Sequence, residues 1–347
     1  MKPNLLFRNK SDSISVQIEK KSVIVICLLF LLVILSVAVG TGIGNTMITP
    51  MEVIVTIFGR GSGEYDFIIQ TLRLPRVLAS LFVGAALGIS GVILQGMIRN
   101  PLASPDIIGI TSGASFAAVA FITFLGGIVS IKFLPIAAIS GAILVSLLIY
   151  LLSWRSGITP IRLVLIGIGM SAIMGAGTTF MLVMSPIFSL GKAYIWLTGS
   201  VYGASWADVC MMASVLFIIV PLVLFLARSL SLQELGDDIA IGLGIHVHLH
   251  RFLLLLFSVL LAGFAVSIAG AIGFVGLIAP HIARKLVGRP FGSLILVSAL
   301  IGSALVFNAD LVARTAFFPL DIPAGVFTAG IGAPFFIYLL FKNRNQF

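Results

Sequence analysis

The sequence predicts an all-α, polytopic membrane protein with about ten transmembrane helices. Of its 347 residues, 59% are hydrophobic and only 10% are charged, whereas soluble domains carry about 25% charged residues. Apolar runs of roughly the 20 residues that a helix needs to cross a bilayer recur along the whole chain. The 36 glycines favour close packing of such helices, because helix interfaces in lipid are rich in small residues.

The apolar runs are separated by short polar connections. The apolar part of the first run, Val23–Val39, is too long for the core of a cleaved signal peptide. Only glycine-rich sequence separates the seventh run from the eighth, so we expect ten spans, give or take one. The expected spans are 23–44, 76–98, 107–127, 132–153, 161–184, 207–228, 252–270, 273–288, 293–313 and 324–341.

Two of these runs share their glycine spacing. Gly84–Gly91 (GAALGISG) lies in the second run and Gly263–Gly270 (GFAVSIAG) in the seventh. If the spans alternate in direction, these two cross the membrane in opposite senses. The pattern is that of an inverted internal repeat, which many transporters contain.

The distribution of charge predicts the orientation. With the N-terminus in the cytoplasm, most of the 21 Lys and Arg residues fall on the inner side, in agreement with the positive-inside rule. An even number of spans then places both termini in the cytoplasm. Residues 1–22 form a cytoplasmic tail, 23–347 the transmembrane domain, 229–251 a cytoplasmic segment, and 45–75 and 185–206 extracytoplasmic segments.

The basic residues expected outside are the exceptions to this rule. They are Arg60, Arg73, Arg76, Lys132, Lys192 and Arg314. The net charge of +9 follows the membrane topology, so we expect membrane lipid and no nucleic acid as a partner.

Several kinds of chemistry are missing from the sequence. There is no GxxxxGK[ST] phosphate loop, no HExxH motif and no Ser/His/Asp constellation. The expected spans hold no carboxylate relay of the kind that ion-coupled transporters use. We therefore expect no enzyme activity and no cofactor, and energy for any pumping has to come from another subunit.

The polar segment Ser229–Arg251 (SLSLQELGDDIAIGLGIHVHLHR) is the most informative part of the chain. Ser231 and Glu234 have the spacing of a capping box that begins a short helix. We expect Gly236 to end that helix and Asp237 to cap a second one. An apolar stripe of Leu232, Leu235, Ile239 and Leu243 recurs at helical spacing. Two such amphipathic helices can fit a groove on a soluble partner; the alternative is an interfacial connector without a partner.

His246, His248 and His250 in the same segment form an H-x-H-x-H pattern. On a helix they point to different faces, so no metal site is expected there. His281 is a lone histidine, for which packing or a hydrogen bond is the simpler interpretation.

Four stretches together resemble a known family. They are Arg73–Ile110, Leu235–Gly244 (LGDDIAIGLG), Gly270–Arg284 (GAIGFVGLIAPHIAR) and Pro323–Leu340. In this order they resemble the FecCD-type permease subunits of ATP-binding-cassette importers for ferric siderophores, haem and vitamin B12. The resemblance implies a vitamin B12-permease-like fold in a bacterial cytoplasmic membrane. The implied partners are a second permease subunit, identical or not, two cytoplasmic ATPase subunits and an extracytoplasmic substrate-binding (lipo)protein.

The resemblance also implies roles for individual residues. Those expected to couple to the ATPase are Gln233, Glu234, Gly236, Asp237, Ala240, Leu243 and Gly244. Those expected to dock the binding protein are Arg73, Arg76 and Arg314. Anchoring to lipid phosphate groups is the alternative, and Arg314 also has the spacing of an internal pair with Asp310. Those expected at a cytoplasmic gate are Asn100 and Leu102 on one side and Pro160 and Ile161 on the other.

The fifth run carries methionines on one face. Met170, Met174, Gly177, Met181 and Met184 lie close together around a helix of 3.6 residues per turn. Methionine is flexible and polarisable, and the resembling helix in the family borders the translocation path, so these residues are expected to line it. Ordinary helix packing is the alternative.

A ferric siderophore is the expected cargo. Haem and cobalamin are the alternatives within the same architecture, and an ion-coupled secondary transporter is an alternative of another class. The missing carboxylate relay argues against ion coupling. A siderophore already encloses its iron, so the chain itself needs no metal site.

Overall fold

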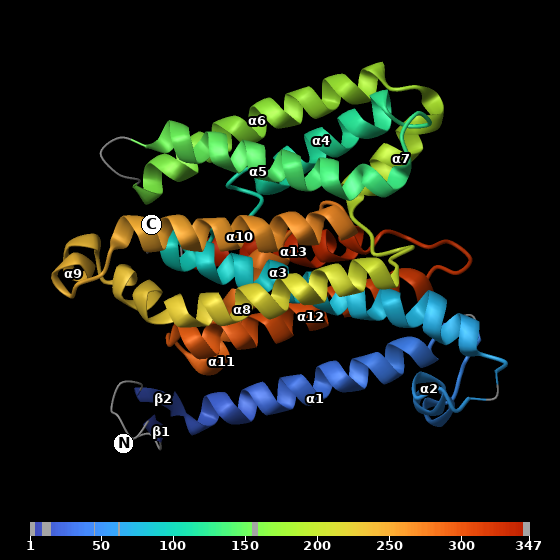
Figure 1. Cartoon of the computed structure of the whole chain (residues 1–347), viewed down its shortest axis with the longest axis horizontal. Coiled ribbons are helices and arrows are strands. Elements are labelled where there is room, and N and C mark those ends of the chain that lie inside the picture. The colour runs from blue at the N-terminus through green and yellow to red at the C-terminus, as the bar shows by residue number, and fades with distance from the viewer. Residues whose placement is uncertain (1–3, 9–14, 45, 62, 155–158, 343–347) are drawn as a thin grey trace.

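The structure is a computed structural model that describes residues 4–8, 15–44, 46–61, 63–154 and 159–342. Its long helices run roughly side by side along one axis (Figure 1). Within the described residues, eight helices are long and apolar enough to cross a membrane. A helix satisfies all its backbone polar groups internally, which lipid requires of a spanning segment.

Each of the ten expected spans corresponds to a helix. They are α1 (Lys20–Gly42), α3 (Leu74–Ile98), α4 (Ile110–Phe124), α5 (Leu134–Ser153), α6 (Pro160–Met184), α8 (Trp206–Glu234), α10 (Val247–Ala269), α11 (Val275–Val287), α12 (Phe291–Thr315) and α13 (Ala324–Lys342). Prolines stand in the first turn of α3, α5 and α6, where the missing N–H costs no hydrogen bond. Ser205 and Asp208 form a capping box at the start of α8.

Two of the ten helices are shorter than expected. Helix α4 has 15 residues and α11 has 13, which at 1.5 Å per residue gives about 22 and 20 Å, less than the roughly 30 Å of a bilayer core. Non-helical backbone precedes each, at 99–109 and 270–274. Such backbone is tolerated at membrane depth where protein covers it, and Ala103, Ile108 and Ile272 are buried accordingly.

The connections contain further short elements. Segment 45–75 holds α2 (Pro50–Ile57) and the π-helix η1 (Phe67–Arg73), which runs directly into α3. The second span therefore begins before the predicted residue 76. Segment 185–206 holds α7 (Ile187–Thr198), the 3-10 turn η2 (Ile131–Phe133) precedes α5, and α9 (Asp237–Gly242) joins α8 to α10.

An antiparallel β-hairpin was not expected in the N-terminal tail. Strands β1 (Asn4–Arg8) and β2 (Ser15–Glu19) pair with Asn4 opposite Glu19. They precede α1 at the end of the molecule where α9 lies (Figure 1). The remainder of the predicted tail, 1–3 and 9–14, lies outside the described residues.

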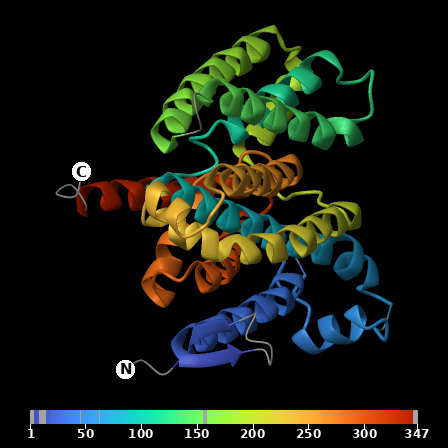
Figure 2. The same ribbon diagram turned by 60° about the vertical axis from the view of Figure 1, so that its left-hand side comes forward.

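Helix α3 is the centre of the bundle. It contacts α8, α10, α11 and α12, and nearly all its residues are buried. Figure 2 shows this central group between α4–α7 on one side and α1 and α2 on the other. Helix α1 is more apolar, with mean hydropathy 3.3 in its most apolar window against 2.3 for α3. Its leucines are mostly exposed, which is the pattern of a helix facing lipid.

The glycines of α3 allow its neighbours to approach closely. A Cβ on Gly84 would collide with the carbonyl of Gly302 in α12, and one on Gly91 with the carbonyl of Gly276 in α11. Helices α3 and α10 run antiparallel, as predicted for the two glycine motifs. The motifs contact different partners, however, since Gly263 faces Ala142 of α5. The inverted repeat stays a prediction.

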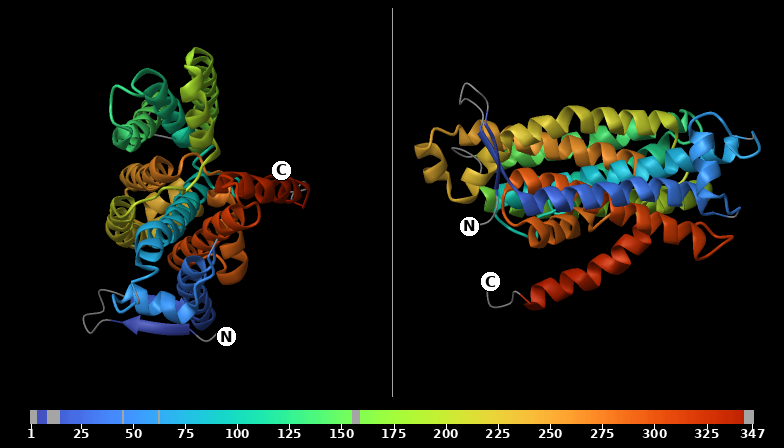
Figure 3. Two further views of the ribbon diagram at one scale, coloured as in Figure 1. Left: turned by 90° about the vertical axis from the view of Figure 1, so that its right-hand side faces the viewer. Right: turned by 90° about the horizontal axis from the view of Figure 1, so that it is seen from below.

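Helix α13 diverges from the bundle, and its last residues lie toward the same end as α9 (Figure 3). The start of α1 lies at that end too (Figure 1). The first membrane helix, α1, thus begins on the same side of the bundle on which the last, α13, ends, as an even number of spans requires. We call this side the α9 end and the other side the arginine end, after Arg73, Arg76 and Arg314.

Candidate functional site

The α9 end carries a short helix between two sharp backbone turns. Helix α8 runs to Glu234, and Gly236 has φ +130° and ψ 152°, a conformation that is almost restricted to glycine. Helix α9 follows, and Gly244 at φ +83° turns the chain toward α10. The prediction that Gly236 breaks the helix is confirmed. The prediction that Asp237 caps the next helix is wrong, because Gly236 is itself the N-cap of α9 and Asp237 is its first residue.

The predicted capping box is wrong. Ser231 and Glu234 lie in the last turn of α8, and the Ser231 hydroxyl donates to the Ala227 carbonyl one turn back, at 3.0 Å. The helix continues through Ser231 because nothing before Gly236 interrupts it. The α9 end therefore has one separate short helix and not two.

Asp237 anchors α9 to the bundle. Arg251 of α10 donates from Nη2 to both carboxylate oxygens of Asp237, at 2.9 and 3.1 Å. Arg99, at the end of α3, pairs with the same carboxylate and donates from Nε to the Gln233 carbonyl at 2.7 Å. Partial burial acts to raise the pKa of Asp237, but the hydrogen bonds and charges of Arg251 and Arg99 outweigh it and hold the pKa below its ordinary value.

The outer surface of this end is apolar. Leu235, Ile239, Ile241 and Leu243 are each more than half exposed, and we call these four residues the α9 patch. Ala240 and Gln233 face inward and are buried. Three members of the predicted apolar stripe are thus exposed together. Exposed leucines and isoleucines next to polar groups are typical of a surface that a partner covers.

The histidines near α9 do not gather. His250 Nδ1 shares a hydrogen bond of 2.7 Å with the Ser229 hydroxyl, and the His248 ring lies against Trp154. Across the described residues, no three His, Cys, Asp or Glu side chains are placed to hold a metal ion.

A small pocket lies beside the α9 end, between the loop after α3 and the start of α6. It has a volume of about 320 Å³. Its lining brings the predicted gate residues Asn100 and Ile161 together, whereas Leu102 and Pro160 are next to it in the chain and not part of the lining. The Asn100 side chain accepts from the Leu102 N–H at 2.9 Å and so holds the turn in shape. The residues lining the pocket are Ile98, Arg99, Asn100, Pro101, Ile161, Val164 and Leu165.

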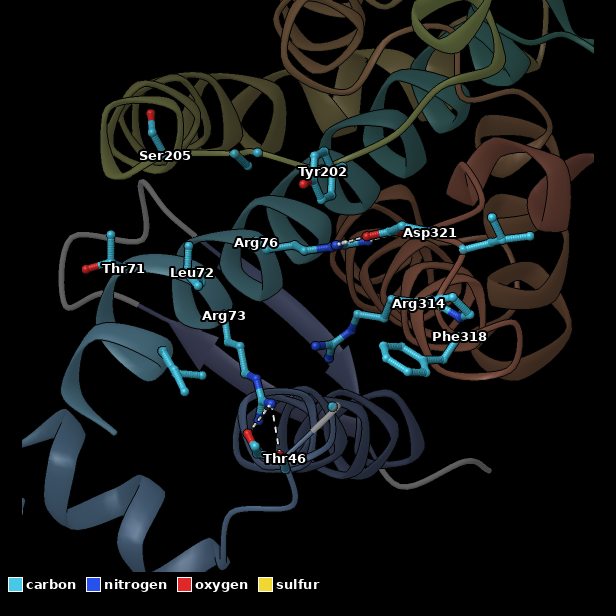
Figure 4. Close-up of a pocket in the computed structure, with 16 residues that line it drawn as sticks. Thr46, Thr71, Leu72, Arg73, Arg76, Tyr202, Ser205, Arg314, Phe318 and Asp321 are labelled. Carbon is cyan, nitrogen blue, oxygen red and sulfur yellow. Dashed lines mark hydrogen bonds and ion pairs between the residues drawn. The ribbon is translucent and has the colours of Figure 1, made fainter. Parts of the chain in front are cut away.

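The arginine end has a larger pocket of about 590 Å³, and the three predicted arginines line it (Figure 4). Arg76 is the most constrained. Its Nε and Nη2 donate to Asp310 of α12, and its Nη1 and Nη2 donate to Asp321, all at 2.6 to 3.0 Å. The Tyr202 ring lies 5.4 Å from its guanidinium carbon.

The other two arginines hold the end of α1. Arg73 donates to the carbonyls of Thr41 and Gly42 at 3.0 and 3.1 Å and to Thr46 at 2.9 Å. Arg314 donates to the Gly40 carbonyl, and its Nε lies 3.7 Å from Asp310. The helix end supplies free carbonyls and a partial negative charge, which suits cations. The internal pair of Arg314 with Asp310 is present, as the alternative interpretation stated.

Comparison with known proteins identifies the family. Residues 28–342 match the profile of the FecCD transport family. The chain belongs to the FecCD transport family. This FecCD chain is 50% identical to the achromobactin transport system permease protein CbrC of Dickeya dadantii, over 88% of its own length and 87% of that protein.

Another relative and a solved structure also match the chain over most of its length. The siderophore transport system permease protein YfhA of Bacillus subtilis is 49% identical, with 88% of this chain and 90% of that protein covered. Among solved structures, a metal-chelate type ABC transporter in an inward-facing conformation matches with a TM-score of 0.80 and 32% identity. That match covers 92% of this chain and 99% of the other. The FecCD chain is thus a multi-pass, helical membrane protein of the ABC permease fold.

The methionines of α6 in this FecCD protein lie mostly inward. Met170 and Met174 pack against the main core, and Met181 packs against the cluster around Val119. A Cβ on Gly177 would contact the Phe116 ring of α4. Met184 alone of the five is largely exposed. The packing alternative describes four of these positions, so α6 presents mainly other residues on its exposed side.

Three functional contacts were missed by reasoning from the sequence. Asp321 is the second partner of Arg76, Arg99 is a partner of Asp237, and Arg251 is the other. Asp321 follows Pro319 in a loop, and no spacing rule connects it to Arg76. For Arg99 and Arg251 a signal was present: Arg99 directly follows the expected span 76–98, and Arg251 directly precedes the expected span 252–270, both on the expected inner side.

Proposed function

We propose that this protein is the permease subunit of an ABC importer that brings an iron(III)-siderophore complex into the cytoplasm. The observation that carries the proposal is the α9 patch, an exposed apolar surface on a short helix that Asp237 fixes to α3 and α10. The family supports it, and CbrC and YfhA, both named for siderophore transport, are about half identical to this chain.

The α9 end is the cytoplasmic side in this proposal, and both termini are there. Two ATPase subunits, one on each permease subunit, receive the α9 patch together with Gly236 and Gly244. Gln233, Asp237 and Ala240 hold that surface in place from behind. Closure of the ATPases on ATP moves α9 as a rigid helix and opens or closes the path. Glu234, at the end of α8, borders the same contact.

The arginine end then faces the extracytoplasmic binding protein. The pocket there is lined by three arginines and by Asp321, while Asp310 is buried against Arg76. The local charge is therefore positive, which suits acidic groups on a docking partner. Because the arginines have internal partners, we propose that they shape the docking surface and that a docked acidic side chain competes with Asp321 for Arg76.

The exposed side of α6 faces the path and the second permease subunit. One side of α6 packs on α4 and α5, while Leu165, Ile168, Ile173, Phe180 and Val183 remain exposed on the other. Met184 is the predicted path residue that this surface includes. Asn100, Leu102, Pro160 and Ile161 form the cytoplasmic gate around the 320 Å³ pocket.

Reconstitution tests the proposal. The protein is assembled in vesicles with its second permease subunit, its ATPase and its binding protein. Uptake of a radiolabelled ferric siderophore, of labelled haem and of labelled cobalamin is then measured with and without ATP. Siderophore uptake that needs ATP supports the proposal. Uptake of haem or cobalamin in its place contradicts the cargo, and uptake driven by an ion gradient without ATP contradicts the importer itself.

A further inference from the structure

We propose that Arg99 is a positioning residue that transmits movement of α9 to the gate loop. It does so by pairing with Asp237 while its own backbone begins the loop after α3. The inference rests on the proposed function, since it concerns how an ATPase contact at α9 reaches the gate. It assigns to one side chain the connection between two regions that lie 138 positions apart in the sequence.

The backbone places Arg99 at an uncommon position. It is the C-cap residue of α3, with φ 57° and ψ 33° in the left-handed region. Glycine is the usual residue at such a helix end because a Cβ is unfavourable there. Only one other non-glycine residue in the described part of the chain, Phe274, has a positive φ. Arg99 therefore carries a long cationic side chain at a backbone position where any side chain is unfavourable.

The side chain turns toward α9 and makes two contacts. Its Nη2 pairs with the Asp237 carboxylate, and its Nε donates to the Gln233 carbonyl at 2.7 Å. Gln233 is in the last turn of α8, and Asp237 is the first residue of α9. Arg99 thus contacts both sides of the Gly236 turn, so a rotation of α9 about that turn moves the guanidinium.

Asp237 does not depend on Arg99 alone. Arg251, whose side chain is only 3% exposed, binds the same carboxylate from α10. Helix α10 is part of the central group and contacts α3, α5 and α8. Arg251 therefore fixes α9 to the bundle, while Arg99 connects it to the loop. The two arginines separate anchoring from transmission.

The other side of Arg99 is the gate loop. The Arg99 main chain continues into Asn100 and Pro101, and all three residues line the pocket that faces Ile161, Val164 and Leu165 of α6. The Asn100 N–H donates to the Gln95 carbonyl at 3.2 Å, and its side chain holds the Leu102 N–H. This turn is small and hydrogen-bonded, so displacing Arg99 shifts the whole loop relative to α6.

A purely stabilising ion pair is the competing explanation. The Arg99 and Asp237 side chains are 32% and 38% exposed, and ion pairs this exposed contribute little to stability. Loss of Arg99 should therefore leave the fold intact. If the pair only stabilises the fold, transport should then hardly change, whereas transmission predicts that ATP hydrolysis continues while transport fails.

The test uses the complete reconstituted importer and three variants. Arg99→Gln removes the charge, Arg99→Lys retains it, and Arg228→Gln is the matched control, because Arg228 is an exposed arginine of α8 near the same end. Labelled iron delivered as ferric citrate and as a ferric hydroxamate chelate is the probe. The measured quantity is iron imported per ATP hydrolysed, together with the amount of ATPase that co-purifies with the permease.

Arg99→Gln should lower the iron imported per ATP roughly five- to tenfold, the range of a modest coupling free energy. ATPase binding and ATP hydrolysis should stay within about twofold of wild type. Arg99→Lys should recover much of the loss, and Arg228→Gln should match wild type.

Three outcomes overturn the inference. An unchanged ratio in Arg99→Gln shows that no transmission passes through this residue. A parallel fall of uptake, hydrolysis and ATPase binding shows that Arg99 holds the ATPase contact and does not move the gate. An equal loss of iron imported per ATP in Arg99→Lys and Arg99→Gln shows that the positive charge of Arg99 is not what transmits the movement. A wild-type complex without ATP-dependent uptake contradicts the proposed function instead, so the two failures are distinguishable.

Discussion

Arg76 of α3 and Asp310 of α12 form a buried ion pair with two-point contact. Nε of Arg76 lies 3.0 Å from both carboxylate oxygens, and Nη2 lies 2.7 Å from Oδ1. The residues are 234 positions apart in the sequence. Because the Asp310 side chain is only 2% exposed, the pair fixes the relative position of the two helices most central to the bundle.

Replacing Arg76 with Met should destabilise the protein by about 3–5 kcal/mol, since it leaves Asp310 as a buried charge with only Arg314 nearby. The control is Asp321→Asn, which removes the more exposed carboxylate and should cost about 1 kcal/mol or less. Unfolding in detergent micelles measures both. Equal losses in the two variants would show that Asp310 is not the partner that matters.

Asp321→Asn should also strengthen association with the binding protein. If an acidic side chain of that protein competes with Asp321 for Arg76, neutralising Asp321 frees the guanidinium, and affinity should rise about two- to fivefold, as expected for a partly exposed pair. Binding to the detergent-solubilised permease at low and high salt is the measurement. Weaker binding at both salt concentrations, with unchanged thermal stability, would refute the competition.

Gly236→Ala should impair transport through backbone strain. At φ +130° and ψ 152° an alanine costs about 1–3 kcal/mol, although the only atom near a Cβ there is Ile239 Cδ1 at 3.9 Å. Gly242→Ala is the matched control, because Gly242 has no atom within 4 Å of a Cβ and no positive φ. Siderophore uptake at equal expression is compared. Similar uptake by the two variants would mean that the Gly236 turn is dispensable.

The α9 patch predicts an interface hot spot. Leu243→Gln should weaken binding of the ATPase by about 2 kcal/mol, or roughly 30-fold, if Leu243 is buried at the centre of the contact. Leu249→Gln is the control, since Leu249 is similarly exposed on α10 but lies outside the patch. Titration of purified ATPase against the permease in detergent gives both affinities. An equal effect of the two substitutions would argue that neither marks the contact.

The contribution of Asp237 to stability should depend on pH at the acid end. Its pKa is lower in the folded state than in the unfolded chain, where it is about 3.9. The stabilisation is therefore complete above about pH 4 to 5 and is lost as the pH falls through the folded-state pKa. Wild type should exceed Asp237→Asn in thermal stability at pH 6, and the gap should shrink as the pH falls below about 4. A gap that stays constant on acidification until both variants unfold would assign the effect to something other than ionisation.

Much of this protein followed from the sequence by itself. The ten apolar runs, the glycine-rich second span and the break at Gly236 are local patterns, and each was confirmed as a helix or a turn. Local patterns are enough there because lipid forces an apolar run to satisfy its backbone as a helix, and because only glycine adopts the conformation at Gly236 easily.

The tertiary structure decided what each polar side chain contacts. Arg76 and Arg314 were expected to face a partner, and the fold gives them Asp310, Asp321 and the Gly40 carbonyl. Met170, Met174 and Met181 of α6 pack on neighbouring helices because α4 lies on their side of α6, whereas Met184 is exposed. Helices α3 and α10 run antiparallel, so the C-terminal end of α3 lies beside the N-terminal end of α10. Arg99 and Arg251 can therefore both reach Asp237. Such pairs join residues far apart in the chain, and the hydrophobic periodicity of the sequence does not predict which helix ends lie side by side.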